Sequence, residues 1–284
     1  MLSEYILLNG KYYSTNENNL SHHNRGFCYG DALFETIHCL GTQPQFFELH
    51  WARLIRGMGI LKMIPGDDFG LVNIQKCIEK LLNKNRIFKG ARIRLTVFRD
   101  AEGYYTPGKD TISWLIETSV LQQEQYTLNT KGLVIEIFDE LHKPVNILSN
   151  LKTTNALIYV LAGIYRREKG FDECLILNQY GRIAESISSN VFATYGNTII
   201  TPPLPDGCIE GTMRQTVLKI AKDMGYKTEE RGLLEKNILE AEEVFLTNAI
   251  KGIQWIGAYK ERRYYNFIAR KLSAKLNEVA FIAI

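Results

Sequence analysis

Lys152 has the sequence neighbourhood in this chain that is best suited to covalent chemistry. It is followed by Thr153-Thr154 and by an apolar segment with helical spacing, residues 155–170. A lysine amine can form a Schiff base with a carbonyl compound, and once released it can move protons between neighbouring atoms. Most lysines are solvated surface residues, and Lys152 considered alone fits that interpretation better. The other groups that such chemistry requires must therefore be found elsewhere in the sequence.

A carboxylate and a polar turn lie together in AESISSNVF, residues 184–192. Glu185 could pair with a cationic ring nitrogen, and Ser188, Ser189 and Asn190 precede an apolar, strand-like run. Polar side chains and backbone N–H groups in such a turn can bind an anion. An ordinary Ser/Asn turn explains the same residues equally well in isolation.

Two further features favour the binding of a phosphate group. Gly211-Thr212 opens an amphipathic helical segment, residues 211–226, and the N–H groups and positive dipole end of such a helix attract anions. Arg53 lies on a helical pattern and could reach the same phosphate as a charge-assisted pair. A punctuating glycine and an arginine on a solvated helix face are the alternatives. Together, a lysine, a carboxylate and an anion seat suit a phosphorylated carbonyl cofactor.

The elements that would position these residues form two α+β blocks. In the first block, Asn9-Gly10 predicts a hairpin turn between two β-rich runs. Helices are expected at residues 48–61 and 69–83, and strands at 31–40, 91–100 and 111–120. The polar stretch 121–130 lacks helical periodicity and predicts the linker, so we expect domains at residues 1–120 and 121–284.

The second block carries the lysine, the carboxylate and the best helix. The segment after Lys152 predicts a helix capped by threonine and closed by basic residues and Gly170, which would put the lysine at a loop-to-helix junction. Short strands are expected around the polar turn, and a final helix at residues 265–277.

Six segments resemble, in order and spacing, the signature segments of class IV aminotransferases, which are fold type IV enzymes dependent on pyridoxal 5′-phosphate (PLP). They are NRGFCYGDALFET (24–36), LHWARL (49–54), LKTTNAL (151–157), AESISSNVF (184–192), EGTMRQ (210–215) and EVFLTNA (243–249). The resemblance covers nearly the whole chain. It implies a two-domain α+β fold like that of D-amino-acid aminotransferase, with the cofactor in the interdomain cleft, and a homodimer in which each subunit helps to close the other's site.

The same resemblance implies a role for each candidate residue. Lys152 would be the Schiff-base lysine, displaced when the amino substrate binds as an external aldimine, and Glu185 would keep the pyridine nitrogen protonated and the ring a better electron sink. The residues expected at the cofactor are Lys152, Arg53, Glu185, Ser188, Ser189, Asn190, Gly211, Thr212, Met213 and Asn248, with residues 211–213 acting mainly through backbone N–H groups. Those expected at the substrate are Phe34, Arg99, Tyr104 and Ala249.

Three local features favour one reaction of the family, that of 4-amino-4-deoxychorismate lyase, which releases pyruvate and 4-aminobenzoate for folate synthesis. Asn155 is typical of the branch that holds the lyases and D-amino-acid transaminases, whereas Met213-Arg214-Gln215 and Asn248-Ala249 resemble the lyases more closely. An amino-acid transaminase of the D-amino-acid or branched-chain type is the alternative. A non-catalytic scaffold that retains the fold is a distant third, because loss of function would have freed Lys152 or Glu185 to change.

One departure from the lyase pattern lies in FRDAEGYYTP, residues 98–107. Tyr104 stands where those enzymes often carry an arginine. Arg92, Arg94 or Arg99 could then bind the substrate carboxylate instead. The identity of the substrate therefore stays open at this point.

Composition excludes several other classes of function. A net charge of +3 is too small and dispersed to indicate nucleic acid or a membrane surface as the partner, so we expect a small molecule. The first residues lack a secretory signal, and five scattered cysteines without a C-x-x-C pair predict free thiols in a cytoplasmic protein. The five histidines have no metal-ligand spacing with cysteine, so no metal is expected.

Overall fold

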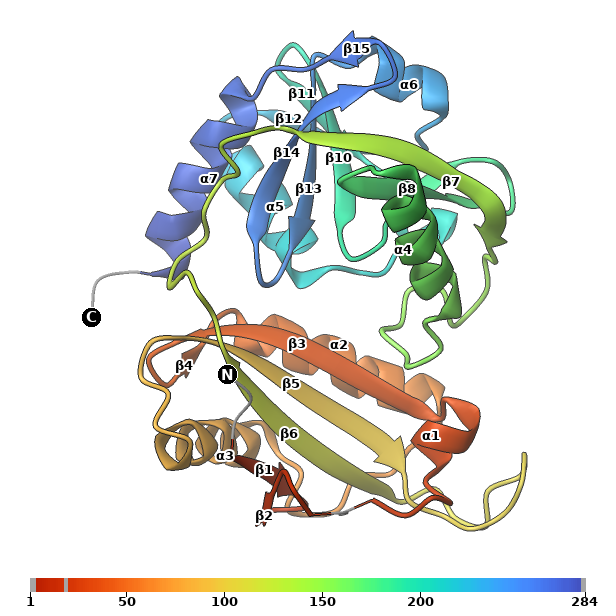
Figure 1. The fold of residues 1–284 in the computed structure, drawn as a ribbon, viewed down its shortest axis with the longest axis vertical. Helices are drawn as coiled ribbons and strands as arrows, with labels where there is room; N and C mark the ends of the chain where they lie inside the picture. The colour runs from red at the N-terminus through yellow and green to blue at the C-terminus, as the bar shows by residue number, and fades with distance from the viewer. Residues whose placement is uncertain (1–3, 18–19, 282–284) are drawn as a thin grey trace. The chain divides into compact units, whose positions relative to one another are not determined.

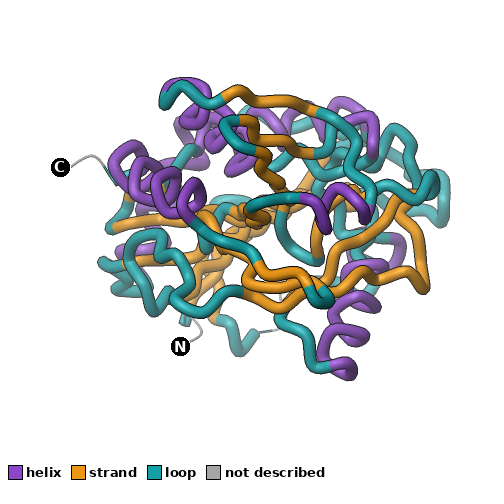
Figure 2. Tube along the Cα trace, turned by 90° about the horizontal axis from the view of Figure 1, so that it is seen from above, coloured by secondary structure: helices purple, strands orange, loops and turns teal. Residues whose placement is uncertain are grey.

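The computed structural model describes residues 4–17 and 20–281, and the contacts within the chain divide it into two compact units. The first unit consists of Met1–Gln125 with Leu151–Asn155, and the second of Tyr126–Asn150 with Ala156–Ile284. Both combine helices and strands, in agreement with the α+β class expected from the sequence, and Figure 2 shows the two kinds of element along the chain. The boundary falls at 125/126 rather than 120/121, inside the expected linker, and the segment with Lys152 groups with the first unit instead of the second.

The described part of the first unit contains an antiparallel sheet and three helices. The strands are β1 Tyr5–Leu8, β2 Lys11–Ser14, β3 Ala32–Leu40, β4 Gln43–Pro44, β5 Gly90–Arg99 and β6 Ile112–Val120, and the helices are α1 Arg25–Tyr29, α2 Phe47–Ile60 and α3 Leu71–Lys84. The strand order is β2-β1-β6-β5-β3-β4. Helices α2 and α3 cover one face of this sheet (Figure 1).

Alternation along the strands gives the first sheet one apolar and one mixed face. Ile37 of β3 is fully buried in the core against Leu54 of α2 and Ile78 of α3. Phe34 and Arg94, on the adjacent strands β3 and β5, are half-buried on the opposite face. That second face therefore carries the side chains that are available for chemistry.

Two local features of the first unit, a hairpin turn and a short helix, differ in whether the sequence predicted them. The Asn9-Gly10 turn between β1 and β2 is confirmed, because both residues adopt the positive φ that such a hairpin requires. The short helix α1 was not predicted. It forms because the Asn24 side chain accepts a hydrogen bond from a first-turn N–H group and Gly30 ends the helix in the left-handed conformation.

The described part of the second unit is built around a mixed sheet. Its strands are β7 Leu133–Lys143, β8 Glu173–Asn178, β9 Ile183–Ser186, β10 Asn190–Tyr195, β11 Thr198–Thr201, β12 Lys227–Glu230, β13 Glu243–Asn248, β14 Gly252–Tyr259 and β15 Arg262–Arg263. Its helices are α4 Leu157–Lys169, the 3₁₀ turn η1 Leu204–Asp206, α5 Thr212–Asp223, α6 Glu235–Glu240 and α7 Phe267–Ala280. The strand order is β12-β11-β10-β13-β14-β7-β8-β9, and β15 pairs with β14. Helix α4 packs on β7 and β8, whereas α5 and α7 pack on each other and on β13 (Figure 1).

Helix α4 differs from its prediction at the N-terminus. Its cap residue is Ala156, which makes no side-chain cap hydrogen bond, so the expected threonine cap is wrong. Thr153 forms a β-bridge with Leu33 instead, and its backbone is unavailable to begin a helix. The predicted end is confirmed, since Gly170 closes α4 in the left-handed conformation behind three basic residues.

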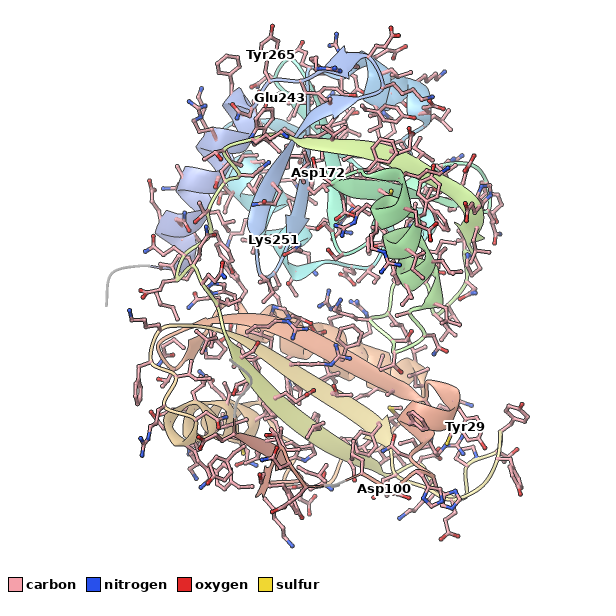
Figure 3. The ribbon with its side chains drawn as sticks, in the orientation of Figure 1. Tyr29, Asp100, Asp172, Glu243, Lys251 and Tyr265 are labelled. Atoms are coloured by element: carbon pink, nitrogen blue, oxygen red, sulfur yellow. The ribbon has the colours of Figure 1, made fainter. Side chains whose placement is uncertain are left out.

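A side chain from the sheet holds the start of α7. Glu243, the first residue of β13, accepts hydrogen bonds from the N–H groups of Ile268, at 2.9 and 3.1 Å, and Ala269, at 3.1 Å (Figure 3). These are N–H groups that a helix leaves unpaired in its first turn. In the part of the chain that the structure describes, no helix is long and apolar enough to cross a membrane.

Candidate functional site

The backbone around Lys152 is paired with strand β3. The N–H group of Phe34 donates to the carbonyl oxygen of Lys152 at 2.9 Å, and the N–H group of Thr154 donates to that of Ala32 at 3.1 Å. Segment 151–155 thus adds a short antiparallel stretch beside β3. The position of the lysine is fixed by these hydrogen bonds rather than by the start of helix α4.

Two cations of the first unit lie over the same aromatic ring. The Lys152 ammonium nitrogen is 4.5 Å from the centroid of Phe34, and the Arg94 guanidinium carbon is 3.9 Å from it. Such contacts attract a cation to the face of the ring. The nearest carboxylate contact of Arg94 is long, 3.9 Å to Glu117, and burial lowers the pKa of Arg94 although Glu117 opposes the shift. Arg94 is therefore a cation that a bound anion would stabilise.

Arg53 belongs to a buried cluster with Glu35 and His50. Its guanidinium donates to both carboxylate oxygens of Glu35, at 2.8 and 2.5 Å, and His50 Nδ1 lies 2.7 Å from one of them. Burial alone would raise the pKa of Glu35, but Arg53 and His50 outweigh it and hold this pKa at about 2. Burial lowers the pKa of His50, so the ring is neutral near pH 7. The ionised carboxylate of Glu35, which His50 also contacts, therefore orients Arg53 within the first unit.

Arg99 is committed to internal contacts. Its guanidinium donates to Asp31 at 2.9 Å, Asp110 at 2.6 Å and the carbonyl oxygen of Leu61 at 2.6 Å, and the side chain is buried. The contact with Asp110 joins the last residue of β5 to the far end of the loop that follows this strand. Most of the N–H donors of Arg99 are therefore used in contacts within the first unit, and its expected contact with the substrate carboxylate stays a prediction.

The loop after β5 projects two tyrosines into solvent. Tyr104 and Tyr105 are 83% and 90% exposed. Arg25 ties the loop down by donating to the carbonyl oxygens of Gly103 and Tyr104, at 2.7 and 2.5 Å. The ring of Tyr104 is free to contact a ligand, whereas its backbone is fixed.

The carboxylate of Glu185 contacts several polar groups of the second unit. Glu185 lies on β9, is 3% exposed and accepts hydrogen bonds from Tyr159 Oη at 2.7 Å and from the backbone N–H of Ile209 at 2.9 Å. The ammonium group of Lys143 forms an ion pair with it. Its three donors, one of them a cation, fix the orientation of this carboxylate.

The polar turn and the helix start are joined by Asn190. Its side-chain amide donates to the carbonyl oxygen of Ile209 at 2.8 Å, and its Oδ1 lies where a Cβ atom on Gly211 would come within 1.9 Å. Only glycine permits this approach at position 211. Asn248, at the end of β13, donates to Ser189 Oγ at 2.9 Å, which leaves the proton of that hydroxyl for an anion.

The start of α5 fits the anion seat that the sequence predicts. Its cap residue is Gly211, and no side-chain cap hydrogen bond is made there. Thr212 and Met213 are buried, so Met213 can contribute its backbone but not its side chain to a ligand. The helix N-terminus therefore offers N–H groups and the positive end of its dipole.

The structure distributes the predicted residues over two groups. One group, in the first unit, holds Phe34, Arg53 and Lys152, and the other, in the second unit, holds Glu185, Ser189, Asn190, Gly211, Thr212, Met213 and Asn248. Ser188 is exposed beside the second group, and Ala249 is half-buried after β13. Over residues 4–17 and 20–281, no group of three or more His, Cys, Asp or Glu side chains is arranged to hold a metal ion.

Four residues of these groups escaped the sequence analysis: Glu35, His50, Lys143 and Tyr159. Glu35 and Lys143 find their partners across 18 and 42 residues of sequence, so no local spacing marks them. One local pattern could have indicated a contact: His50 and Arg53 are three residues apart on one helix and therefore share a face.

Comparisons with known proteins agree on the family to which this chain is similar. A family model described as amino-transferase class IV matches residues 32–259. The chain is 30% identical over 251 residues to aminodeoxychorismate lyase of Bacillus subtilis (strain 168), across 86% of this chain and 83% of the relative. It is 26% identical over 289 residues to a putative branched-chain-amino-acid aminotransferase of Methanocaldococcus jannaschii, across 96% of both chains.

A solved structure extends the likeness to the fold. The branched-chain amino acid aminotransferase from Thermobaculum terrenum in its PLP-form superposes with a TM-score of 0.86 at 21% sequence identity. The match covers 99% of this chain and 94% of that one. The two chains therefore share the same fold over almost their whole lengths.

Proposed function

Because the chain belongs to the class IV aminotransferase family, we propose that it is a PLP-dependent enzyme in which Lys152 carries the cofactor as a Schiff base. The pairing of segment 151–155 with β3, which fixes the lysine beside Phe34, supports this role. When bound, PLP supplies an electron sink for negative charge that develops at the substrate carbon. Lys152, once released by the substrate amine, is then the group that moves the proton.

The remaining residues fit the other parts of this cofactor. Glu185 is a buried carboxylate that can pair with a protonated ring nitrogen. For the phosphate group, the uncapped start of α5 and the preoriented guanidinium of Arg53 offer N–H donors and positive charge. The residues proposed to share this phosphate seat are Ser188, Ser189, Asn190, Gly211, Thr212 and Met213, with Asn248 behind Ser189.

For the reaction we propose 4-amino-4-deoxychorismate lyase, which expels pyruvate and leaves 4-aminobenzoate for folate synthesis. The relative from Bacillus subtilis supports this choice, as do Asn155, the Met213-Arg214-Gln215 sequence and the Asn248-Ala249 pair. An amino-acid transaminase is the second candidate, supported by the relative from Methanocaldococcus jannaschii. The two reactions would use the same cofactor residues and differ in their later step: a transaminase returns a proton to the cofactor carbon, whereas the lyase breaks the bond that releases pyruvate.

Arg94 is the residue that we propose for the substrate carboxylate. It lies over the same ring as Lys152, and among the described residues its one ion pair is long, 3.9 Å to Glu117, whereas Arg99 forms close ion pairs with Asp31 and Asp110. An arginine can grip a carboxylate through two parallel N–H donors. Tyr104, exposed on the loop after β5, and Ala249 are the other proposed contacts.

We also propose a homodimer in the cytoplasm. Leu157, Val160, Leu161 and Ile164, which we call the α4 stripe, are 77%, 53%, 45% and 37% exposed. They follow the spacing of a single helix face, and an exposed apolar stripe of this kind favours burial against a partner. The cytoplasmic location is supported by the five free cysteines.

A paired assay tests the proposed reaction. Purified, PLP-loaded protein is given 4-amino-4-deoxychorismate, and pyruvate and 4-aminobenzoate are measured; in parallel, D-alanine, L-leucine and L-glutamate are tested for conversion of the bound cofactor to its amine form by absorbance. We expect release of both products, abolished by Lys152→Ala. Conversion by an amino acid without release of pyruvate would make the protein a transaminase.

A further inference from the structure

A second lysine is buried in the second unit, beside the carboxylate assigned to the cofactor ring. Lys143 is the last residue of β7 and is only 6% exposed. Its ammonium group donates to the carbonyl oxygen of Ser149 at 3.0 Å and forms an ion pair with Oε1 of Glu185. Lysine is almost never buried to this extent unless it is paired, so the contact with Glu185 is what permits the burial.

The donors around Glu185 are distributed unequally over its two oxygens. Oε1 accepts from Lys143 and from the hydroxyl of Tyr159, and each carboxylate oxygen has about two lone-pair sites, so Oε1 is saturated. Burial raises the pKa of Tyr159, and the charge of Glu185 raises it further, so the tyrosine is a neutral O–H donor. Oε2 accepts from the backbone N–H of Ile209. Among the described residues this is the one donor to Oε2, which leaves a lone pair on this oxygen for a ligand.

The charge of Lys143 determines which form of Glu185 such a ligand meets. A buried carboxylate without a cation tends to take up a proton and become neutral. A neutral carboxyl group would not stabilise a positively charged ring nitrogen. The ammonium of Lys143 offsets the cost of burying the charge, and the neighbouring hydroxyl group fixes the orientation of the carboxylate.

We propose that Lys143 is a positioning residue that keeps Glu185 ionised and oriented before the cofactor binds, with Oε2 left to accept the N–H group of the cofactor ring. This proposal rests on the proposed PLP-dependent function and deepens it. It also separates the two lysines: the ammonium group of Lys143 is committed to its ion pair, whereas Lys152 is the amine that carries the cofactor.

The test is titration of the apoprotein with PLP, followed by protein fluorescence and by the visible absorbance of the bound cofactor. Lys143→Met removes the charge and should weaken PLP binding by about tenfold, the effect of a coupling of about 1.4 kcal/mol, and should shift the visible band. Lys143→Arg keeps the charge and should retain most of the affinity and the wild-type band. Lys131→Met, at an exposed lysine of the same unit, is the matched control and should change neither property.

A second pair of variants tests whether Lys143 acts through Glu185. Glu185→Gln should itself weaken binding, and adding Lys143→Met to it should weaken binding by less than about twofold more, because the carboxylate that Lys143 serves is gone. This double variant buries no unpaired charge, so it should fold even where Lys143→Met alone does not.

Two results would overturn the proposal while leaving the PLP-dependent function intact. One is wild-type affinity and an unchanged absorbance band in Lys143→Met. The other is an equal loss on adding Lys143→Met to wild type and to Glu185→Gln, which would make the two residues independent. Failure of the wild-type protein to bind PLP would instead refute the proposed function, and this proposal with it.

Discussion

At the scale of single residues, ion pairs buried within each unit prepare the groups that a cofactor would meet. Arg53 is oriented by Glu35 and His50, and Glu185 by Lys143 and Tyr159. In each cluster one residue, Arg53 or Glu185, is proposed to contact the cofactor. The other residues of the cluster hold that residue in place and are not proposed to contact the cofactor. The side chains are thereby fixed before binding, which lowers the entropic cost of ordering them when the ligand binds.

The contribution of the Glu35 cluster to stability should depend on pH. The pKa of the Glu35 carboxyl group is lowered from 4.5 to about 2, which corresponds to about 3 kcal/mol of unfolding free energy. Because the folded-state pKa is the lower one, this stability is present above pH 4.5 and is lost as the pH falls towards 2. Denaturant unfolding of wild type and Glu35→Gln should therefore differ by about 3 kcal/mol at pH 7 and by clearly less at pH 3. A gap that does not change with pH would contradict this explanation.

Arg94 should affect substrate binding and leave the cofactor alone. Arg94→Gln removes the charge proposed for the substrate carboxylate and should raise KM by about tenfold or more, the effect of losing a charge-assisted hydrogen bond of about 1.5–3 kcal/mol. Its affinity for PLP should match that of wild type. Arg92→Gln, on the same strand and the same sheet face, is the control. A larger effect on KM from Arg92→Gln would transfer the assignment to Arg92.

At the scale of elements, patterns within one segment were predictable and contacts between segments were not. Strand β3, helix α5 and the Asn9-Gly10 hairpin follow from periodicity and turn chemistry, and the structure confirms them. The prediction of a threonine cap for α4 was wrong because Thr153 pairs with Leu33, a partner far away in sequence. The site divides in the same way: the motifs that mark Lys152 and Glu185 are local, whereas the partners that orient Glu185 and Arg53 are visible only in the fold.

The link between β13 and α7 is one such contact between elements. Glu243 accepts three hydrogen bonds from the first turn of α7 (Figure 3). Glu243→Ala should lower the free energy of unfolding by about 1–3 kcal/mol, measured by thermal or denaturant unfolding, because it leaves buried N–H groups unpaired. Glu242→Ala, at the exposed neighbouring position, is the control and should change it by less than about 0.5 kcal/mol. Equal effects of the two substitutions would show that the cap does not stabilise α7.

At the scale of the whole molecule, the α4 stripe predicts the oligomeric state. Leu161→Glu places a charge at the centre of the stripe and should convert a dimer to a monomer, because an interface core does not accommodate an unpaired charge. Light scattering coupled to gel filtration measures the molecular mass directly. Val72→Glu, at a 62% exposed position of α3, should leave the dimer intact. A monomeric wild type, or a Leu161→Glu variant that stays dimeric, would refute this assignment of the interface.

The central claim is that Lys152 carries PLP, and trapping the bond tests it most directly. Protein loaded with PLP is reduced with borohydride, which converts a Schiff base into a stable amine, and the modified peptide is identified by mass spectrometry. We predict a pyridoxyl group on Lys152 and none in Lys152→Ala. A label on Lys143, or a label that persists at any other lysine in Lys152→Ala, would contradict the claim.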